Sequence, residues 1–171
     1  MIFLVGMPGA GKTHWLKSFS EVLRYEGVDL DEKIEKRYQR PISRVFKNKE
    51  RDFRIAEREA LVDIIDNYPH NTIVATGGGT PVHFNNLEEM KSAGIVVYLK
   101  AEFDIIFQNL AKNLNKRPFL PKTKQALVEH INQLMLDRSP YYEQADLILP
   151  VKYLNVTFFY DQIKPLLDER E

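Results

Sequence analysis

Gly6-Met7-Pro8-Gly9-Ala10-Gly11-Lys12-Thr13 stands between an apolar run, Ile2–Val5, and an amphipathic stretch, Thr13–Tyr25. The segment matches the pattern G-x-x-x-x-G-K-[ST], and it lies where that pattern is expected, after a predicted strand and before a predicted helix. Glycines let successive backbone N–H groups turn toward one anion, and the helix adds its positive N-terminal end. A plain glycine turn is the alternative, but the full pattern in this context predicts a nucleoside triphosphate site.

The residues of this phosphate loop have separate expected tasks. Lys12 is expected to reach the β- and γ-phosphates, and the Thr13 hydroxyl is expected to ligate Mg²⁺. The predicted nucleotide contacts within the loop and just after it are Gly9, Ala10, Gly11, Lys12, Thr13 and His14. ATP with Mg²⁺ is therefore the expected phosphate donor.

Composition excludes several classes of protein. Lys+Arg and Asp+Glu both number 24, so no overall charge favours nucleic acid or anionic lipid as a partner. The chain has no cysteine, which excludes disulfide scaffolds and thiolate metal sites. Apolar runs such as Ile95–Leu99 fall short of the roughly 20 residues of a membrane span, and no basic segment precedes Ile2–Val5 as in a secretory signal. A cytoplasmic protein that binds neither nucleic acid nor membrane is expected.

Short apolar runs alternate with amphipathic stretches along the chain. The predicted strands are Ile2–Val5, Gly27–Leu30, Thr72–Ala75, Ile95–Leu99 and Asp146–Leu149. The predicted helices are Thr13–Tyr25, Arg51–Asn67, Glu102–Leu114, Lys124–Tyr142 and Asn155–Asp168, the last of them kinked or broken at Pro165. Such alternation predicts a single α/β domain over residues 1–171, with a parallel sheet covered by helices on both faces and ligands beyond the carboxyl ends of its strands. The aromatic residues are assigned to the core.

The rest of the sequence narrows the kind of nucleotide-binding protein. A GTPase should carry Asn-Lys-x-Asp, but Asn48-Lys49-Glu50-Arg51 and Asn115-Lys116-Arg117-Pro118 both lack the aspartate. A mechanical ATPase should have an apolar strand that ends in a magnesium-binding Asp, but Thr72–Ala75 runs into glycines instead.

Asp29-Leu30-Asp31 is the best remaining source of acidic groups. Alternation along a strand would place Asp29 and Asp31 on one face, about 6.6 Å apart, one toward metal and the other toward substrate. The alternative is that Asp31 caps a helix over Glu32–Tyr38. The phosphate loop favours the functional interpretation.

Gly77-Gly78-Gly79 and two arginines are candidates for substrate contacts. A triple glycine at a strand end lets the backbone approach a ligand, although a bare tight turn is an equal alternative. Arg54 and Glu57 are three residues apart and can share a helix face, either as a solvated ion pair or as a carboxylate that holds a guanidinium for an anionic substrate. Arg138 is open to the same two interpretations.

The segment Ile105–Val128 contains no acidic residue. It does contain five bases, Lys112, Lys116, Arg117, Lys122 and Lys124. An acid-free stretch in a balanced chain suggests a flap that meets phosphate. A solvated loop or a weak nucleic-acid patch is the alternative, but stacking aromatics are sparse there.

Together these pieces resemble the shikimate kinase family, from the first strand to about Leu149. Besides the phosphate loop, the matching stretches are Val28–Asp31 with Ile34-Glu35, Pro41–Ser43, Phe53–Glu57, Val74–Gly79, Arg117–Leu120 and Arg138–Asp146. The resemblance implies a five-stranded parallel sheet in the order 2-3-1-4-5, a substrate-binding region at about residues 31–60 and a lid at about 111–124. It also implies ATP and shikimate as partners, and we expect a monomer.

The resemblance implies a role for each candidate residue. Asp29 would hold Mg²⁺ together with Thr13, and Asp31 would bind the ring hydroxyls of shikimate and serve as base. Arg54 and Arg138 would hold the shikimate carboxylate, with the glycine turn Gly77, Gly78 and Gly79 as a backbone contact. Arg117 and Lys12 would stabilise the transferred phosphoryl group. The sequence departs from the family at His14, where a second hydroxyl is usual.

The implied reaction is phosphorylation of the 3-hydroxyl group of shikimate by ATP. A kinase for gluconate or a nucleoside monophosphate is the alternative on the same scaffold, and a catalytically silent nucleotide-binding protein is the alternative from another class. The paired arginines with Asp31 favour a small hydroxylated carboxylate. A silent protein is expected to lack Lys12, Asp29, Asp31 or Arg117, and all four are present.

Overall fold

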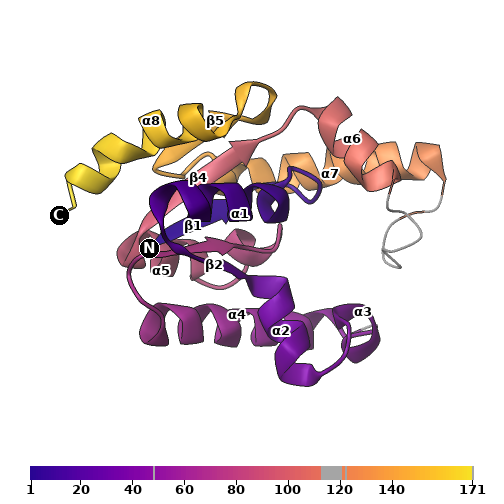
Figure 1. The fold of residues 1–171 in the computed structure, drawn as a ribbon. Coiled ribbons are helices and arrows are strands. Elements are labelled where there is room, and N and C mark those ends of the chain that lie inside the picture. The colour runs from indigo at the N-terminus through magenta and orange to yellow at the C-terminus, as the bar shows by residue number, and fades with distance from the viewer. Residues whose placement is uncertain (48, 113–120, 122, 171) are drawn as a thin grey trace.

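A parallel sheet forms the centre of the structure, a computed structural model that describes residues 1–47, 49–112, 121 and 123–170 (Figure 1). Its strands are β1 (Ile2–Val5), β2 (Glu26–Asp29), β3 (Thr72–Ala75), β4 (Ile95–Lys100) and β5 (Leu147–Pro150). They lie in the order β2-β3-β1-β4-β5, and every neighbouring pair is parallel. The expected sheet order is confirmed.

Helices cover both faces of this sheet, which confirms the α/β class. Their bounds are α1 (Lys12–Leu23), α2 (Leu30–Tyr38), α3 (Ile42–Val45), α4 (Glu50–Asn67), α5 (Asn86–Ala93), α6 (Phe103–Ala111), α7 (Lys124–Tyr142) and α8 (Val156–Asp168), with short 3₁₀ turns at Thr80–Val82 and Val151–Tyr153. Helices α1 and α8 pack on one face, whereas α4, α5 and α7 pack on the other. Figure 1 shows α8 and α4 on opposite sides of the strands. None of the helices in the described part of the chain is long and apolar enough to cross a membrane.

The central strand β1 explains how the two layers are held together. Its side chains alternate between the faces, so that Ile2 and Leu4 join the cluster with α1 and α8 while Phe3 and Val5 join the opposite cluster. All four are fully buried. A strand with apolar residues on both sides is typical of a parallel sheet between two helical layers. The layers fix the carboxyl end of β1, where the phosphate loop begins.

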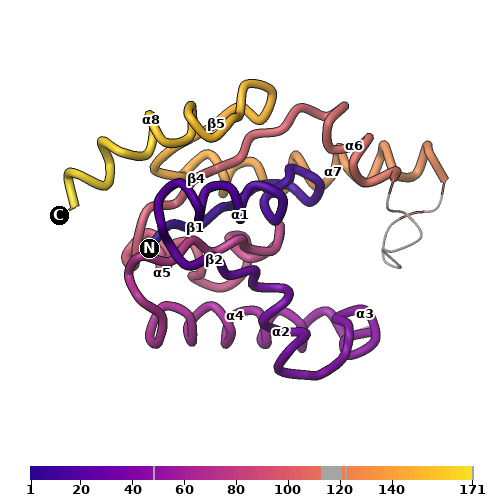
Figure 2. The backbone as a smooth tube through the Cα atoms, viewed as in Figure 1, coloured from indigo at the N-terminus to yellow at the C-terminus, as the bar shows by residue number. Residues whose placement is uncertain are grey.

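The acids Asp29 and Asp31 do not share a strand face, so that prediction is wrong. Strand β2 ends at Asp29 and α2 begins at Leu30, which places Asp31 in the first helical turn, and the backbone tube in Figure 2 runs from β2 directly into α2. The helix cap is Asp29 rather than Asp31, because its Oδ1 accepts hydrogen bonds from the amides of Asp31 at 3.0 Å and Glu32 at 3.2 Å.

The expected break at Pro165 is also absent, because α8 continues to Asp168. Proline removes one N–H donor and leaves the carbonyl of Asp161 without its helical partner. Both Asp161 and Pro165 lie on the exposed side of α8, where water can satisfy that carbonyl. The predicted bounds of Ile2–Val5, Thr72–Ala75 and Lys124–Tyr142 are confirmed. The other predicted elements differ from the structure by one or two residues at their ends, and the end of Glu102–Leu114 falls outside the described residues.

Candidate functional site

The phosphate loop joins β1 to α1 and takes a backbone shape that its glycines permit. Gly6, Gly9 and Gly11 have φ angles of 139°, 86° and 91°, a region that other residues rarely adopt. A Cβ atom on Gly6 would lie only 2.7 Å from the carbonyl oxygen of Leu99. The loop therefore needs glycine both for its turn and for its close approach to the strand beside it.

Lys12 is folded across this loop. Its side-chain amine donates to the carbonyl oxygens of Gly6 at 2.7 Å and Met7 at 3.0 Å, and the residue is only 8% exposed. The ammonium group is thus held at the phosphate loop rather than extended into solvent, and its contact with the phosphates of a nucleotide stays a prediction. A phosphate group at the loop would meet a cation already in place, which lowers the cost of ordering that side chain.

Thr13 and Asp29 lie together although they are far apart in the sequence. The Thr13 hydroxyl donates to Oδ2 of Asp29 at 2.7 Å, while Oδ1 of Asp29 caps α2. Hydroxyl and carboxylate oxygens are hard donors that suit Mg²⁺, which keeps several water ligands and needs few protein groups. The pair fits the metal role that the sequence predicts. His14 is exposed and packs edge-on against Trp15, with 5.3 Å between ring centroids, and its nucleotide contact stays a prediction.

Asp31 lies where the phosphate loop meets the glycine turn after β3. Its Oδ1 is 3.5 Å from the position that a Cβ on Gly77 would take. Asp31 is exposed at the start of α2. The protein atoms around its carboxyl group nevertheless raise its pKa to about 6, and the negative charges of Asp29 and Glu57 act in the same direction. Asp31 is therefore a carboxyl group whose protonation changes close to neutral pH, which suits a proton acceptor.

The glycine turn Gly77–Gly79 lies between the two candidate arginines. A Cβ on Gly79 would collide with the guanidinium group of Arg54. A Cβ on Gly78 would lie 3.1 Å from Nη1 of Arg138 and 2.7 Å from the ring of Pro8. Because side chains would fill the space that the arginines occupy, close approach explains these glycines better than a bare turn does.

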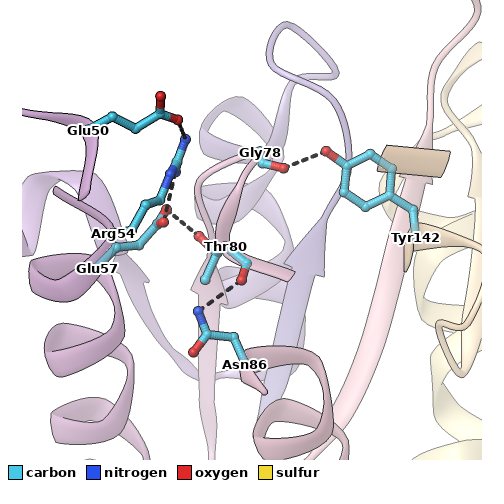
Figure 3. A network of polar contacts seen from close by, with 7 residues as sticks. All are labelled: Glu50, Arg54, Glu57, Gly78, Thr80, Asn86 and Tyr142. Atoms are coloured by element: carbon cyan, nitrogen blue, oxygen red, sulfur yellow. Dashed lines mark hydrogen bonds and ion pairs between the residues drawn. The ribbon is translucent and has the colours of Figure 1, made fainter. Parts of the chain in front are cut away.

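Glu57 holds Arg54 in place through a buried ion pair (Figure 3). Arg54 Nη1 lies 2.9 Å from Glu57 Oε2, and the Thr80 hydroxyl donates to Glu57 Oε1 at 2.5 Å. The Glu57 side chain is fully buried and that of Arg54 is 13% exposed. The alternative of a solvated surface pair is therefore wrong. A second carboxylate, Glu50 Oε1, lies 3.3 Å from Arg54 Nη2 at the exposed end of the guanidinium.

Three buried polar residues at this site were not predicted from the sequence. The side-chain amide of Asn86 donates to the Thr80 carbonyl oxygen at 2.9 Å, which ties the turn to α5 (Figure 3). The Tyr142 hydroxyl donates to the Gly78 carbonyl oxygen at 2.5 Å from the end of α7. Thr80 is the third of these residues. Its position directly after the triple glycine is the one sequence signal that could have indicated its place in the site.

The acid-free segment is only partly described. Arg117 and most of the predicted lid fall outside the described residues, so its role stays a prediction. At the described end of that segment, the Asn109 side-chain amide of α6 donates to the Gly9 carbonyl oxygen at 2.8 Å. This contact, which the sequence did not predict, ties α6 to the phosphate loop.

Comparison with known proteins points to one family. The family model for shikimate kinase matches residues 8–162. A shikimate kinase from Azobacteroides pseudotrichonymphae is 32% identical over 166 residues, which cover 96% of this chain and 97% of that protein. The crystal structure of shikimate kinase from Bacteroides thetaiotaomicron is similar with a TM-score of 0.87 and 32% identity, over 98% of this chain and 97% of that one. Shikimate kinase from Acinetobacter baumannii in complex with shikimate has a TM-score of 0.85 and 28% identity, over 99% and 93% of the two chains.

Proposed function

Because this chain belongs to the shikimate kinase family, we propose that it transfers the γ-phosphoryl group of ATP to the 3-hydroxyl group of shikimate, giving ADP and shikimate 3-phosphate. It is an ATP-dependent kinase. The observation that carries the choice of acceptor is the placement of Arg54 and Arg138 on the two sides of the glycine turn, with Asp31 beside the same turn. Two guanidinium groups suit a carboxylate, and a nearby acid suits a hydroxyl group.

The proposed mechanism relies on positioning and charge. The oxygen of the 3-hydroxyl group forms a bond to the γ-phosphorus while the bond from that phosphorus to the bridging oxygen of ADP breaks. Asp31 orients the hydroxyl group and accepts its proton late in the step. Lys12 and Arg117 stabilise the charge on the transferred group, which is the main contribution of the protein in phosphoryl transfer.

Thr13 and Asp29 are the proposed holders of Mg²⁺. When bound, the ion would neutralise charge on the phosphates. Gly9 and Gly11 would contribute backbone N–H groups to the same phosphates, whereas the N–H of Ala10, the other predicted contact, donates to the Met7 carbonyl oxygen at 3.0 Å. The proposed substrate-binding region extends over about residues 31–60. We propose that the protein acts as a monomer in the cytoplasm, with ATP and shikimate as its partners and no nucleic acid.

Thr13→Val is expected to raise the Mg²⁺ concentration needed for half-maximal ADP release by about tenfold. Valine keeps the shape of threonine but lacks the hydroxyl that lies against Asp29 and is proposed to ligate the ion. Thr13→Ser keeps the hydroxyl and is the matched control, for which we expect a change of no more than about twofold. A titration of Mg²⁺ at fixed ATP measures both variants. If the serine and valine variants respond alike, Thr13 does not contribute to the metal site.

Arg138→Ala is the most direct test of the acceptor. In a coupled ADP-release assay, we expect wild-type protein with Mg·ATP to respond to shikimate and not to gluconate. The variant is expected to raise the KM for shikimate about a hundredfold and leave the KM for ATP nearly unchanged, since a bidentate charged contact to a carboxylate is lost. Arg37→Ala, which removes an equal charge from the exposed pair with Glu59, is the control.

The other outcomes of that assay separate the alternatives. Release of ADP with gluconate alone would keep the kinase scaffold and overturn the proposed substrate. ATP binding without release in the presence of either acceptor would favour a catalytically silent nucleotide-binding protein.

A further inference from the structure

Tyr142 is a fully buried tyrosine whose hydroxyl ends at the glycine turn. It is the last residue of α7, and it donates to the Gly78 carbonyl oxygen at 2.5 Å (Figure 3). Burial raises the pKa of Tyr142 to about 12, although the positive charge of Arg138 acts in the opposite direction. The hydroxyl therefore keeps its proton at neutral pH and remains a hydrogen-bond donor.

The bonded carbonyl belongs to the peptide unit between Gly78 and Gly79. In a trans peptide the C=O of one residue and the N–H of the next share a plane and point in opposite directions. The Gly79 N–H therefore points away from Tyr142, to the side on which Figure 3 places Arg54 and Glu57. Within the described residues, the N–H groups of Gly78 and Gly79 donate to no other group, so both remain available to a bound ligand.

This peptide unit needs something to hold its orientation. Glycine adopts positive and negative φ angles almost equally well, so a unit between two glycines can turn over at low cost. The carbonyl has a single partner among the described residues, the Tyr142 hydroxyl. Backbone hydrogen bonds from Thr80 to Gly77 and from Val82 to Gly79 close the turn but do not involve the Gly78 carbonyl or the Gly79 N–H. Loss of the Tyr142 bond would therefore let this peptide unit turn over within the closed turn.

Tyr142 is also close to Arg138, which lies one helical turn earlier in α7. Nη1 of Arg138 is 3.1 Å from the position that a Cβ on Gly78 would take. Arg54 has carboxylate partners in Glu57 and Glu50, whereas no carboxylate of the described residues lies within ion-pair distance of Arg138. The position of Arg138 thus depends on its own helix and on its neighbours there, among them Tyr142.

We propose that Tyr142 is a positioning residue for shikimate: its hydroxyl fixes the Gly78–Gly79 peptide so that the Gly79 N–H faces the acceptor on the side of Arg54. This inference rests on the proposed function, because it assigns a task within the same acceptor site. Tyr142 itself does not touch the reacting atoms. Its effect is on the affinity for the acceptor and not on nucleotide binding.

Tyr142→Phe tests the role, because phenylalanine keeps the ring in the core and removes only the hydroxyl. We expect the KM for shikimate, and its dissociation constant by calorimetry, to rise about three- to tenfold, the usual range for loss of one hydrogen bond. The kcat and the KM for ATP are expected to stay within about twofold of wild type. Tyr98→Phe is the matched control, since Tyr98 is a buried tyrosine with its ring centroid 5.1 Å from that of Tyr142.

A second variant keeps the test valid if Tyr142→Phe folds poorly. Tyr142→para-aminophenylalanine retains an N–H donor at the same place and is expected to keep the shikimate KM within about threefold of wild type. An unchanged shikimate KM in Tyr142→Phe, or an equal rise for ATP, would overturn the proposed role. If wild-type protein releases no ADP with shikimate, the proposed function fails. If wild-type protein is active and Tyr142→Phe behaves identically, only the role of Tyr142 fails.

Discussion

Asp31→Asn is expected to lower kcat for shikimate phosphorylation by about a hundredfold, with the KM for ATP nearly unchanged. Asparagine has the shape of aspartate but cannot take the proton of the acceptor, and general-base contributions start near this size. We expect the low end of that range, because little proton transfer has occurred in a loose phosphoryl-transfer transition state. Steady-state ADP release measures the effect.

Glu32→Gln is the matched control for this variant, since Glu32 is the next acid in the same helical turn and is exposed. It is expected to keep kcat within about twofold of wild type. Equal kcat values for Asp31→Asn and wild type would remove Asp31 from the reaction.

The same substitution is expected to stabilise the protein at neutral pH. The pKa of Asp31 rises from 3.8 to about 6 on folding, through burial first and then the charges of Asp29 and Glu57. Between these two pH values the folded state binds more protons than the unfolded state, so wild-type stability falls as pH increases through this window. Above it, Asp31→Asn should be more stable by about 1 kcal/mol after screening by solvent, and near pH 4 the advantage should disappear. Urea unfolding at pH 4 and pH 7.5 measures the difference.

The features that the sequence predicted correctly depend on local patterns. The phosphate loop is eight consecutive residues whose glycines, lysine and threonine act together, and its flanking strand and helix follow from hydrophobic periodicity. The contact between Arg54 and Glu57 could also be predicted, because residues three apart share a helix face. The burial of this pair could not be predicted, because it depends on Thr80 and the glycine turn, which follow β3 and are distant in the sequence.

The features that the sequence analysis missed have two different physical origins, one local and one long-range. Asp29 and Asp31 were placed on one strand face because alternation was extended by two residues, whereas the carboxylate of Asp29 caps α2 and starts the helix at Leu30. Tyr142 was assigned to the core, and its ring does lie there, but the hydroxyl bonds a residue 64 positions away. A long-range partner of that kind leaves no periodicity in the sequence.

Arg54→Ala is expected to lower the free energy of unfolding by about 3 kcal/mol, the largest effect on stability among these variants. The Glu57 side chain is fully buried, and Arg54 is its cationic partner at 2.9 Å. Removal of one member of a buried pair leaves an uncompensated charge, which costs several kcal/mol. Arg37→Ala, which breaks an exposed pair with Glu59, is expected to change stability by no more than about 0.5 kcal/mol.

The double variant Arg54→Ala with Glu57→Gln separates this stability effect from substrate binding. Glutamine removes the buried charge and can still accept the hydrogen bond of the Thr80 hydroxyl, so at least about half of the lost stability should return. Arg54→Ala is also expected to raise the KM for shikimate, because the acceptor carboxylate loses a guanidinium partner. In the double variant this KM should stay equally high, because no guanidinium has been restored. Urea unfolding and steady-state kinetics on the same preparations check both statements. If stability and shikimate KM recover together, Arg54 acts through the fold and not through contact with the substrate.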